Sequence, residues 1–222
     1  MKNKFKYDLH THTREGSFNT SISVYDLIRI LDENEYDGLL ITDHNSYNGY
    51  KFYKEHMRNL FRGISVIKGI EYDTKEANVI IVMPSNANTN IFTCPGLHLR
   101  QTIDIVHEYG GVIGLCYSPN KHLNQAILNE LDFIENNQSN NLPLIKGSNN
   151  HGLRAIGKYY TYLENKINNE DEFIAYIKAK KETIIDDNKF NYSYIKSISN
   201  KFFSILKGII FLPKRMILLR KI

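Results

Sequence analysis

The chain has 222 residues, of which 42% are hydrophobic, 12% aromatic and 23% charged, and its formal net charge at pH 7 is +4. This composition excludes fibrous, collagenous and disordered classes, and the length fits one large domain or one domain with an appendage. The two cysteines, Cys94 and Cys116, lie in no CxxC pair, which disfavours a disulfide framework and a zinc ribbon. The first residues lack the apolar run of a signal peptide, so we expect a reducing, cytoplasmic setting.

Apolar runs bounded by turn residues predict seven strands, and several runs have the continuous hydrophobicity typical of strands buried on both faces of a parallel sheet. The predicted strands lie near residues 5–9, 38–43, 64–70, 78–83, 111–116, 131–134 and 142–146. Helical spacing predicts helices over residues 23–34, 98–109 and 170–181, the first capped by Ser23. This alternation indicates an α/β fold, either an open sheet or a closed barrel.

Histidine or carboxylate side chains follow four of the predicted strands. These groups are Asp8-Leu9-His10-Thr11-His12, Thr42-Asp43-His44, Gly69-Ile70-Glu71 and Gly147-Ser148-Asn149-Asn150-His151. Residues i and i+2 of a strand share a face, so an HxH pair can direct two imidazoles at one ion, although each group alone is also compatible with a structural role. The carboxyl ends of parallel strands meet on one face, where sites are built. Imidazole and carboxylate ligands suit zinc, manganese or iron, which can activate water and clamp a phosphoryl group.

The order of these motifs, DLHTHT, ITDH, GIE and GSNNHG, resembles the PHP (polymerase and histidinol phosphatase) family. The resemblance covers about residues 5–181 and includes the connecting segments VHEYGGVIG and FIENN. It implies a distorted (β/α)7 TIM-like barrel, a cluster of up to three Mn, Fe or Zn ions and the hydrolysis of phosphate esters. Carried over by position, it assigns metal-ligand roles to His10, His12, His44, Glu71 and His151.

Four positions depart from the family pattern. Asn19 stands near an expected aspartate, Asn78 at an expected histidine, Tyr117 at the histidine of a His-Pro pair and Asn149 at the aspartate of the last motif. An asparagine carbonyl can coordinate a metal but is neutral, so negative charge that would offset the ions is lost. The departures argue against a site with three ions.

We therefore expect one bound ion, or two at most, of Mn, Fe or Zn. The main site would be formed by His10, His12 and Glu71 with help from Asn149. It would keep an open position for water. His44 and His151 would form a weaker second position. The alternative is a degenerate pocket that holds no ion.

Phosphate recognition needs positive charge or N–H donors beside the metal. Arg14 and Lys121 are the candidate contacts, and a solvated charge on a loop is the alternative for each. The leading functional hypothesis is a PHP-type hydrolase that acts on a small phosphorylated substrate through metal-activated water. The alternative hypothesis is a degenerate, non-catalytic PHP-like domain that binds a ligand or partner, with the C-terminal segment as its anchor.

The C-terminal segment differs in character from the rest of the chain, and we treat residues 1–187 as the PHP-like domain and residues 188–222 as an appendage. The appendage carries eight Lys and Arg residues and no acid, and its apolar spacing predicts a basic amphipathic helix interrupted at Pro213. Its uncharged runs are too short to span a bilayer. It could lie on an anionic membrane surface, or dock on the domain or on a second copy as a homo-oligomer. Nucleic-acid binding is disfavoured because many large aliphatic residues would face phosphate.

Overall fold

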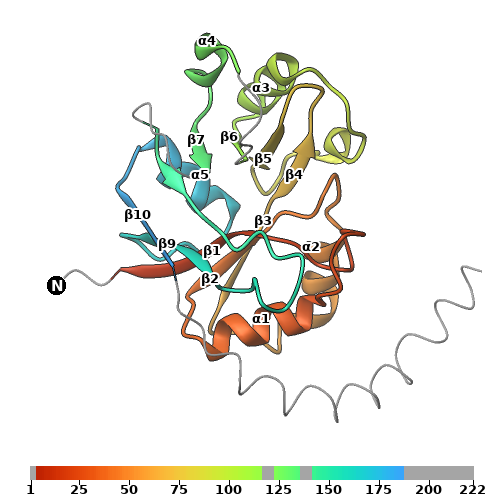
Figure 1. Cartoon of the computed structure of the whole chain (residues 1–222), viewed down its shortest axis with the longest axis vertical. Helices are drawn as coiled ribbons and strands as arrows, with labels where there is room; N and C mark the ends of the chain where they lie inside the picture. Colours follow the sequence, from red (N-terminus) through yellow and green to blue (C-terminus); the bar gives the residue numbers. More distant parts are fainter. Residues whose placement is uncertain (1–3, 117–122, 136–141, 188–222) are drawn as a thin grey trace, which may run out of the picture. The chain divides into compact units, whose positions relative to one another are not determined.

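The computed structural model describes residues 4–116, 123–135 and 142–187 (Figure 1). Within these ranges ten strands and five α-helices make a mixed α/β fold. None of the helices in these ranges is long and apolar enough to cross a membrane. The predicted amphipathic helix lies outside the described residues, as do Tyr117 and Lys121.

The first sheet carries the predicted HxH motif at the end of its central strand. Its strands, in order across the sheet, are β10 (Thr183–Asp187), β9 (Tyr159–Leu163), β1 (Phe5–Thr11), β2 (Gly38–Ile41) and β3 (Ser65–Lys68). Strands β1, β2 and β3 are parallel, whereas β9 is antiparallel to both β1 and β10. The β1–β2 register shifts between Asp8 and Thr11, so the pairing is irregular where His10 lies, as is common beside functional sites.

The second sheet has mixed strand directions. Its order is β4 (Ile70–Asp73), β5 (Asn78–Val82), β6 (Val112–Leu115), β7 (Phe133–Glu135) and β8 (Leu144–Ile145). Strand β5 is antiparallel to β4 and β6, and β6, β7 and β8 are parallel. Because β5 runs in the opposite direction, its first residue lies at the same end of the sheet as the last residues of β6 and β7. This places Asn78 on the face of the predicted site.

The two sheets meet at Gly69, the single residue between β3 and β4. A Cβ at this position would lie 2.9 Å from Leu40 Cδ1, so the close turn from one sheet to the other favours glycine. The predicted strand over 64–70 is therefore two strands. The turn places Glu71 opposite His44 in an isolated parallel bridge.

The expected closed (β/α)7 barrel is not found among the described residues. At the far side of the sheets β10 lies beside β8, but these two strands make no backbone ladder. Beside this gap a side chain links the two sheets, because Thr161 Oγ1 of β9 accepts a hydrogen bond at 2.8 Å from the N–H of Lys146, which follows β8. Antiparallel pairing by β5, β9 and β10 replaces the all-parallel order that the barrel requires.

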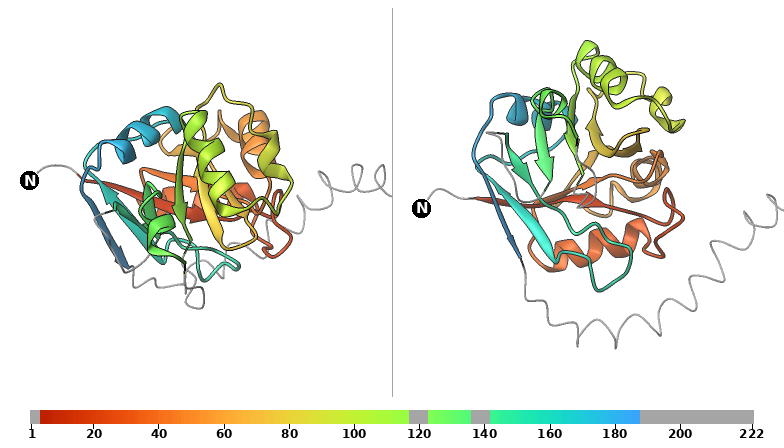
Figure 2. Two further views of the ribbon diagram at one scale, coloured as in Figure 1. Left: turned by 90° about the horizontal axis from the view of Figure 1, so that it is seen from above. Right: turned by 45° about the horizontal axis from the view of Figure 1, so that its top comes forward.

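The helices lie outside the strands, with α1 (Val24–Glu33) and α3 (Leu99–Glu108) on opposite outer sides (Figures 1 and 2). Ser23 caps α1 as predicted, since its side chain accepts a hydrogen bond from the N–H of Asp26. The remaining helical elements are α2 (Asn48–Phe52), a π-turn (Tyr53–Met57), a 3-10 turn (Asn90–Thr93), α4 (Gln125–Leu128) and α5 (Glu170–Lys178).

The main hydrophobic core joins both sheets to α5. It includes Leu9 of β1, Ile80 of β5, Phe133 of β7 and Phe173 of α5, each fully buried. Tyr7 is also fully buried, and its hydroxyl donates to the carbonyl of Ile167 at 2.9 Å. Full burial of a large apolar side chain stabilises a fold by about 1.5–3 kcal/mol. The strand that carries the HxH motif is therefore firmly held by the core below the site.

Candidate metal centre

Three ligand atoms, two from the end of β1 and one from β4, converge beside the end of β1. His10 Nε2 lies 3.1 Å from His12 Nε2 and 3.1 Å from Glu71 Oε2, and His12 Nε2 lies 3.2 Å from the same Glu71 oxygen. All three side chains are buried. We call this group the inner cluster. The structure thus brings together the ligands that were predicted for the main site.

The inner cluster fits a divalent cation. Zinc bonds to nitrogen and oxygen of about 2.0–2.2 Å place neighbouring ligands roughly 3 Å apart, which matches the three separations. A single proton can be shared by only two of these three atoms, whereas an ion between them can bond to all three. Outside the three atoms of the inner cluster, His12 Nδ1 and His44 Nε2 are also buried and have no hydrogen-bond partner within the described part of the chain. Unpaired buried nitrogen atoms of this kind suit a cation site.

Charge in the inner cluster is distributed to favour a cation. Burial lowers the pKa of His12 to about 4, so this imidazole is neutral at pH 7 and can offer a lone pair. Burial acts against the charge of His10, yet the carboxylates of Glu135 and Glu71 raise its pKa well above the ordinary value. Burial also disfavours the Glu71 carboxylate, but contacts with His10 and His12 lower its pKa overall. The ion-free pocket therefore holds a proton on His10 between two carboxylates.

The segment after β8 fixes the backbone around the HxH motif. A Cβ at Gly147 would lie 2.0 Å from the backbone nitrogen of His10, so only glycine fits so close to this strand. Asn149 has a φ of 43° and donates its N–H to the His10 carbonyl at 2.8 Å. Asn150 is fully buried; its Oδ1 accepts the His12 N–H at 2.9 Å and its Nδ2 donates to the His12 carbonyl at 2.8 Å. Sequence analysis gave Asn150 no role.

Asn149, the predicted neutral substitute for a ligand, contacts the inner cluster directly. Its Oδ1 lies 3.0 Å from His12 Nε2. Asparagine tolerates left-handed backbone better than most residues, which explains how the side chain can turn back to the site. An amide oxygen at this position can complete the ligand set without adding negative charge.

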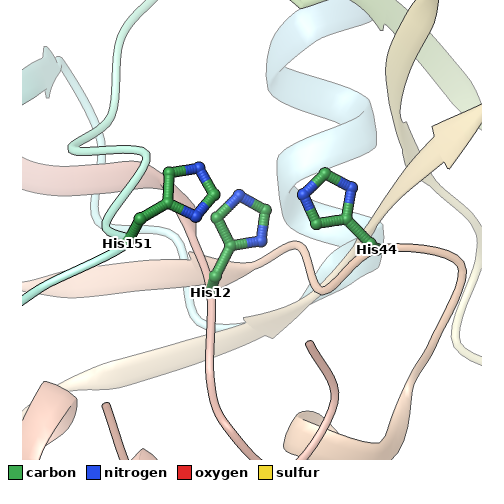
Figure 3. Close-up of side chains that lie close together, drawn as sticks. All are labelled: His12, His44 and His151. Carbon is green, nitrogen blue, oxygen red and sulfur yellow. The ribbon is translucent and has the colours of Figure 1, made fainter. Parts of the chain in front are cut away.

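His44 and His151 lie outside the inner cluster, on either side of the His12 ring, and we call this pair the outer cluster. Figure 3 shows the His12 ring between them, with centroid distances of 4.6 Å to His44 and 5.0 Å to His151. The rings are nearly parallel, and ligand atoms of the three histidines lie within 4.8 Å of one another. His44 Nε2 is 3.5 Å from Glu71 Oε2. His44 is half-buried and His151 is exposed, with the pKa of His151 lowered by partial burial and by His44.

The other oxygen of Glu71 has a different neighbour. Asn78 Nδ2 donates a hydrogen bond to Glu71 Oε1 at 3.1 Å. Cys116 is buried close by, and burial together with the charges of Glu71 and Glu135 raises the pKa of its thiol well above the ordinary value. An amide donor and a protonated thiol therefore stand on this side of Glu71, where the family pattern predicts an imidazole at residue 78.

Glu135, at the end of β7, was missed by sequence analysis as a site residue. Both of its carboxylate oxygens lie 3.0 Å from His10 Nδ1, on the ring edge opposite the inner cluster. The residue is 5% exposed. It directly follows the strand predicted near 131–134, within the segment FIENN, but many loop carboxylates follow a predicted strand in this way.

Asp43 of the ITDH motif holds loops rather than facing the inner cluster. Its carboxylate accepts hydrogen bonds from Thr13 N at 2.6 Å, Thr13 Oγ1 at 2.7 Å and Ser17 Oγ at 2.9 Å. Burial raises the pKa of Asp43 to about 6, although these donors oppose the shift. Ser17 Oγ also accepts the N–H of His44 at 3.0 Å. Asp43 therefore fixes the loop that carries His44.

The remaining predicted residues have less direct positions. Arg14 is half-buried and its Nε donates to Glu15 Oε1 at 3.3 Å, while Glu15 Oε2 accepts the N–H of Val24 at the start of α1. Asn19 is exposed, and its backbone bonds to His151. Tyr117 and Lys121 fall outside the described residues, so their predicted roles have no structural test here.

A model of the PHP domain matches residues 8–208, and the chain therefore belongs to this family. The match passes the expected domain end at residue 187. None of the curated proteins matches the chain.

Among solved structures, PsfC from Pseudomonas syringae is 15% identical with a TM-score of 0.64, covering 84% of this chain and 93% of that chain. A structure from Bifidobacterium adolescentis, described as a metal-dependent phosphoesterase, is 13% identical with a TM-score of 0.54, covering 79% and 96%. An amidohydrolase from Chromobacterium violaceum with bound sulfate is 13% identical with a TM-score of 0.50, covering 82% and 97%. At these identities the likeness shows the fold alone.

Proposed function

We propose that the chain is a metal-dependent hydrolase of phosphate esters that works with one tightly bound divalent transition ion. The observation that carries the proposal is the convergence of His10 Nε2, His12 Nε2 and Glu71 Oε2 at 3.1–3.2 Å in a buried pocket. Membership of the PHP domain family, and a structural neighbour described as a metal-dependent phosphoesterase, support this class of reaction.

Each residue of the pocket would supply a different ligand group to the ion. A bound ion would polarise a phosphoryl oxygen and lower the pKa of water. His12 supplies a neutral imidazole, Glu71 the anionic oxygen, and Asn149 a neutral oxygen. An aspartate at this position would carry one negative charge, which Asn149 lacks. The less negative pocket favours an anionic phosphate ester but lowers the affinity for the ion.

The proposal of one ion depends on what surrounds Glu71. A second ion on the Oε1 side of Glu71 would need further ligands, but the side chain that bonds to Oε1 is the neutral amide of Asn78, where the family pattern predicts an imidazole. Burial and the nearby carboxylates raise the pKa of the Cys116 thiol well above its ordinary value, and the outer cluster is less buried than the inner cluster. These contacts support full occupancy of the inner cluster and weak occupancy elsewhere.

The test is elemental analysis of protein purified without chelator, together with hydrolysis of p-nitrophenyl phosphate and bis(p-nitrophenyl) phosphate. We expect about one Mn, Fe or Zn ion per chain, and loss of both metal and turnover in the double variant His10→Ala/His12→Ala. The matched control is His98→Ala/His107→Ala, which removes two exposed histidines paired with Glu76 and Asp132. Metal content that survives the first double variant would rule out the inner cluster as the site.

A second candidate function is a non-catalytic PHP-like domain that binds a ligand or partner through the same pocket. The contact that favours it is the amide of Asn78 on Glu71, because it occupies an oxygen that a larger metal cluster would use. Protein that holds no ion after Mn addition, and hydrolyses neither substrate, would select this function. The anchoring role of residues 188–222 on an anionic membrane surface remains a prediction from the sequence.

A further inference from the structure

Glu135 is a buried carboxylate that the proposed ligand set does not use. It lies on β7 of the second sheet, whereas His10 lies on β1 of the first sheet, so their contact spans the site between the sheets. Burying a carboxylate is costly unless hydrogen bonds or opposite charge offset the loss of water. With 5% of its surface exposed, Glu135 meets that requirement through both oxygens, each 3.0 Å from His10 Nδ1.

We propose that Glu135 is a positioning residue that holds the His10 ring so that Nε2 faces the inner cluster. The proposal rests on the proposed function of that cluster. An imidazole has two nitrogens, and the one that binds a metal is set by the hydrogen bond that the other makes. A carboxylate can only accept, so Glu135 keeps a proton on Nδ1 and leaves Nε2 for coordination. The same contact stops the ring from turning about its χ2 angle.

The geometry favours positioning over direct coordination. His10, Cys116 and Glu135 place ligand atoms within 4.8 Å of one another, so they could also hold an ion. Such an ion would need an unprotonated His10 Nδ1 and a thiolate between the carboxylates of Glu71 and Glu135. Instead, two oxygens at equal distance from one ring nitrogen match a shared N–H donor. The ion site therefore belongs on the Nε2 edge of the ring.

The experiment titrates chelator-treated full-length protein with Co²⁺ and follows its visible absorption, with Zn²⁺ competition to measure affinity. Four forms are compared: wild type, Glu135→Gln, Glu135→Asp and the control Glu170→Gln. Glu170 suits the control because it is a buried carboxylate outside the site. It lies on α5, is 4% exposed and accepts a hydrogen bond from the backbone N–H of Lys68. In parallel, ¹⁵N NMR of the histidine rings in Zn²⁺-loaded protein reports which nitrogen of His10 carries the proton.

We expect Glu135→Gln to bind one ion about 10–100-fold more weakly than wild type and to show an altered His10 tautomer signal. Glu135→Asp should fall between them, and Glu170→Gln should equal wild type. A purely structural role would lower the unfolding midpoint without changing the tautomer signal, which would overturn the proposal.

Two further outcomes are distinguishable. If Glu135→Gln loses one of two ions and keeps the other at wild-type affinity, Glu135 is a ligand and the positioning role is wrong. If wild type itself binds no ion, the proposed function fails, and the positioning role fails with it. Equal affinity and equal His10 signals in wild type and Glu135→Gln would overturn the positioning role alone.

Discussion

The inner and outer clusters use the same kind of side chain but differ in how tightly they bring ligand atoms together. In the inner cluster, His10, His12 and Glu71 are buried and their ligand atoms are 3.1–3.2 Å apart. In the outer cluster, His44 is half-buried and His151 exposed, and His44 Nε2 lies 3.5 Å from Glu71 Oε2. Histidine content alone therefore does not determine where an ion binds.

The support behind each cluster explains the difference. His10 is held by Glu135 across the two sheets, and the backbone of His12 is bonded on both sides by Asn150. His151 is exposed on a loop, and its ring is bonded to the backbone of Asn19, which is itself exposed. Ligands whose orientation is fixed by surrounding hydrogen bonds lose less conformational entropy when an ion binds.

The largest expected effect comes from deleting one histidine in each cluster. His10→Ala should weaken Mn²⁺ binding by more than about 100-fold, because a ligand is lost and Glu135 loses its partner. His151→Ala should weaken it by less than about tenfold. Thermal unfolding with and without Mn²⁺ checks both, since an ion at about 100 times its Kd stabilises by about 2.7 kcal/mol. Equal losses in the two variants would show that the clusters act as one site.

The support of the inner cluster should also be visible in stability. Asn150→Ala leaves the N–H and the carbonyl of His12 without their partners in a buried place, which should lower the free energy of unfolding by about 2–4 kcal/mol. Urea unfolding of chelator-treated protein measures this effect. The exposed Asn168→Ala is the control and should change stability by less than about 1 kcal/mol. An equally small effect at Asn150 would mean that this amide does not hold His12.

The buried carboxyl group of Asp8, two residues before His10, should make the free energy of unfolding depend on pH. Burial raises its pKa from 3.8 to about 6, so the folded state binds a proton more tightly than the unfolded state. The associated stability is fully present below about pH 4 and is lost as the pH rises through about 6.

Relative to Asp8→Asn, wild type should therefore lose about 2–3 kcal/mol between pH 4 and 7. Urea unfolding of ion-free protein at several pH values tests this, with the exposed Asp104→Asn as control. A difference between wild type and Asp8→Asn that stays constant with pH would contradict the raised pKa.

The smallest expected effect comes from adding a negative charge to each cluster in turn. Asn149→Asp places a carboxylate beside His12 and should raise Mn²⁺ affinity about tenfold, which corresponds to about 1.4 kcal/mol. Aspartate also tolerates the left-handed backbone of residue 149. Asn19→Asp, exposed beside the outer cluster, should change affinity less because solvent screens the charge. Calorimetric titration measures both, and a larger gain at residue 19 would reverse the ranking of the clusters.

The central strands were predictable because continuous apolar runs dominate them. Strands β1, β2, β5 and β6 lie within or close to their predicted ranges, and Ser23 caps the first helix as expected. The strands β9 and β10 were not predicted, because neither YYTYL nor TIIDD is a continuous aliphatic run, although tyrosine and threonine themselves favour strands. The antiparallel pairing of β9 with β1 joins residues that are far apart in the chain, and β10 then pairs with β9. The expectation of a closed barrel failed at this point.

The motif histidines were found from sequence because strand ends meet on one face, but their partners were not. Asn78 was recognised as an altered ligand position, whereas its hydrogen bond to Glu71 required the antiparallel β5. Glu135 and Asn150 act through contacts more than 100 residues distant in sequence, with His10 and His12 respectively. Local patterns carry no information on such pairs.

The most direct test of the central claim is anomalous X-ray scattering from crystals of Mn²⁺-loaded protein. The account predicts one strong peak per chain, bonded to His10 Nε2, His12 Nε2 and Glu71. A second peak near His44 and His151, if present, should have much lower occupancy. A strong peak only at the outer cluster, or none at saturating Mn²⁺, would contradict the account.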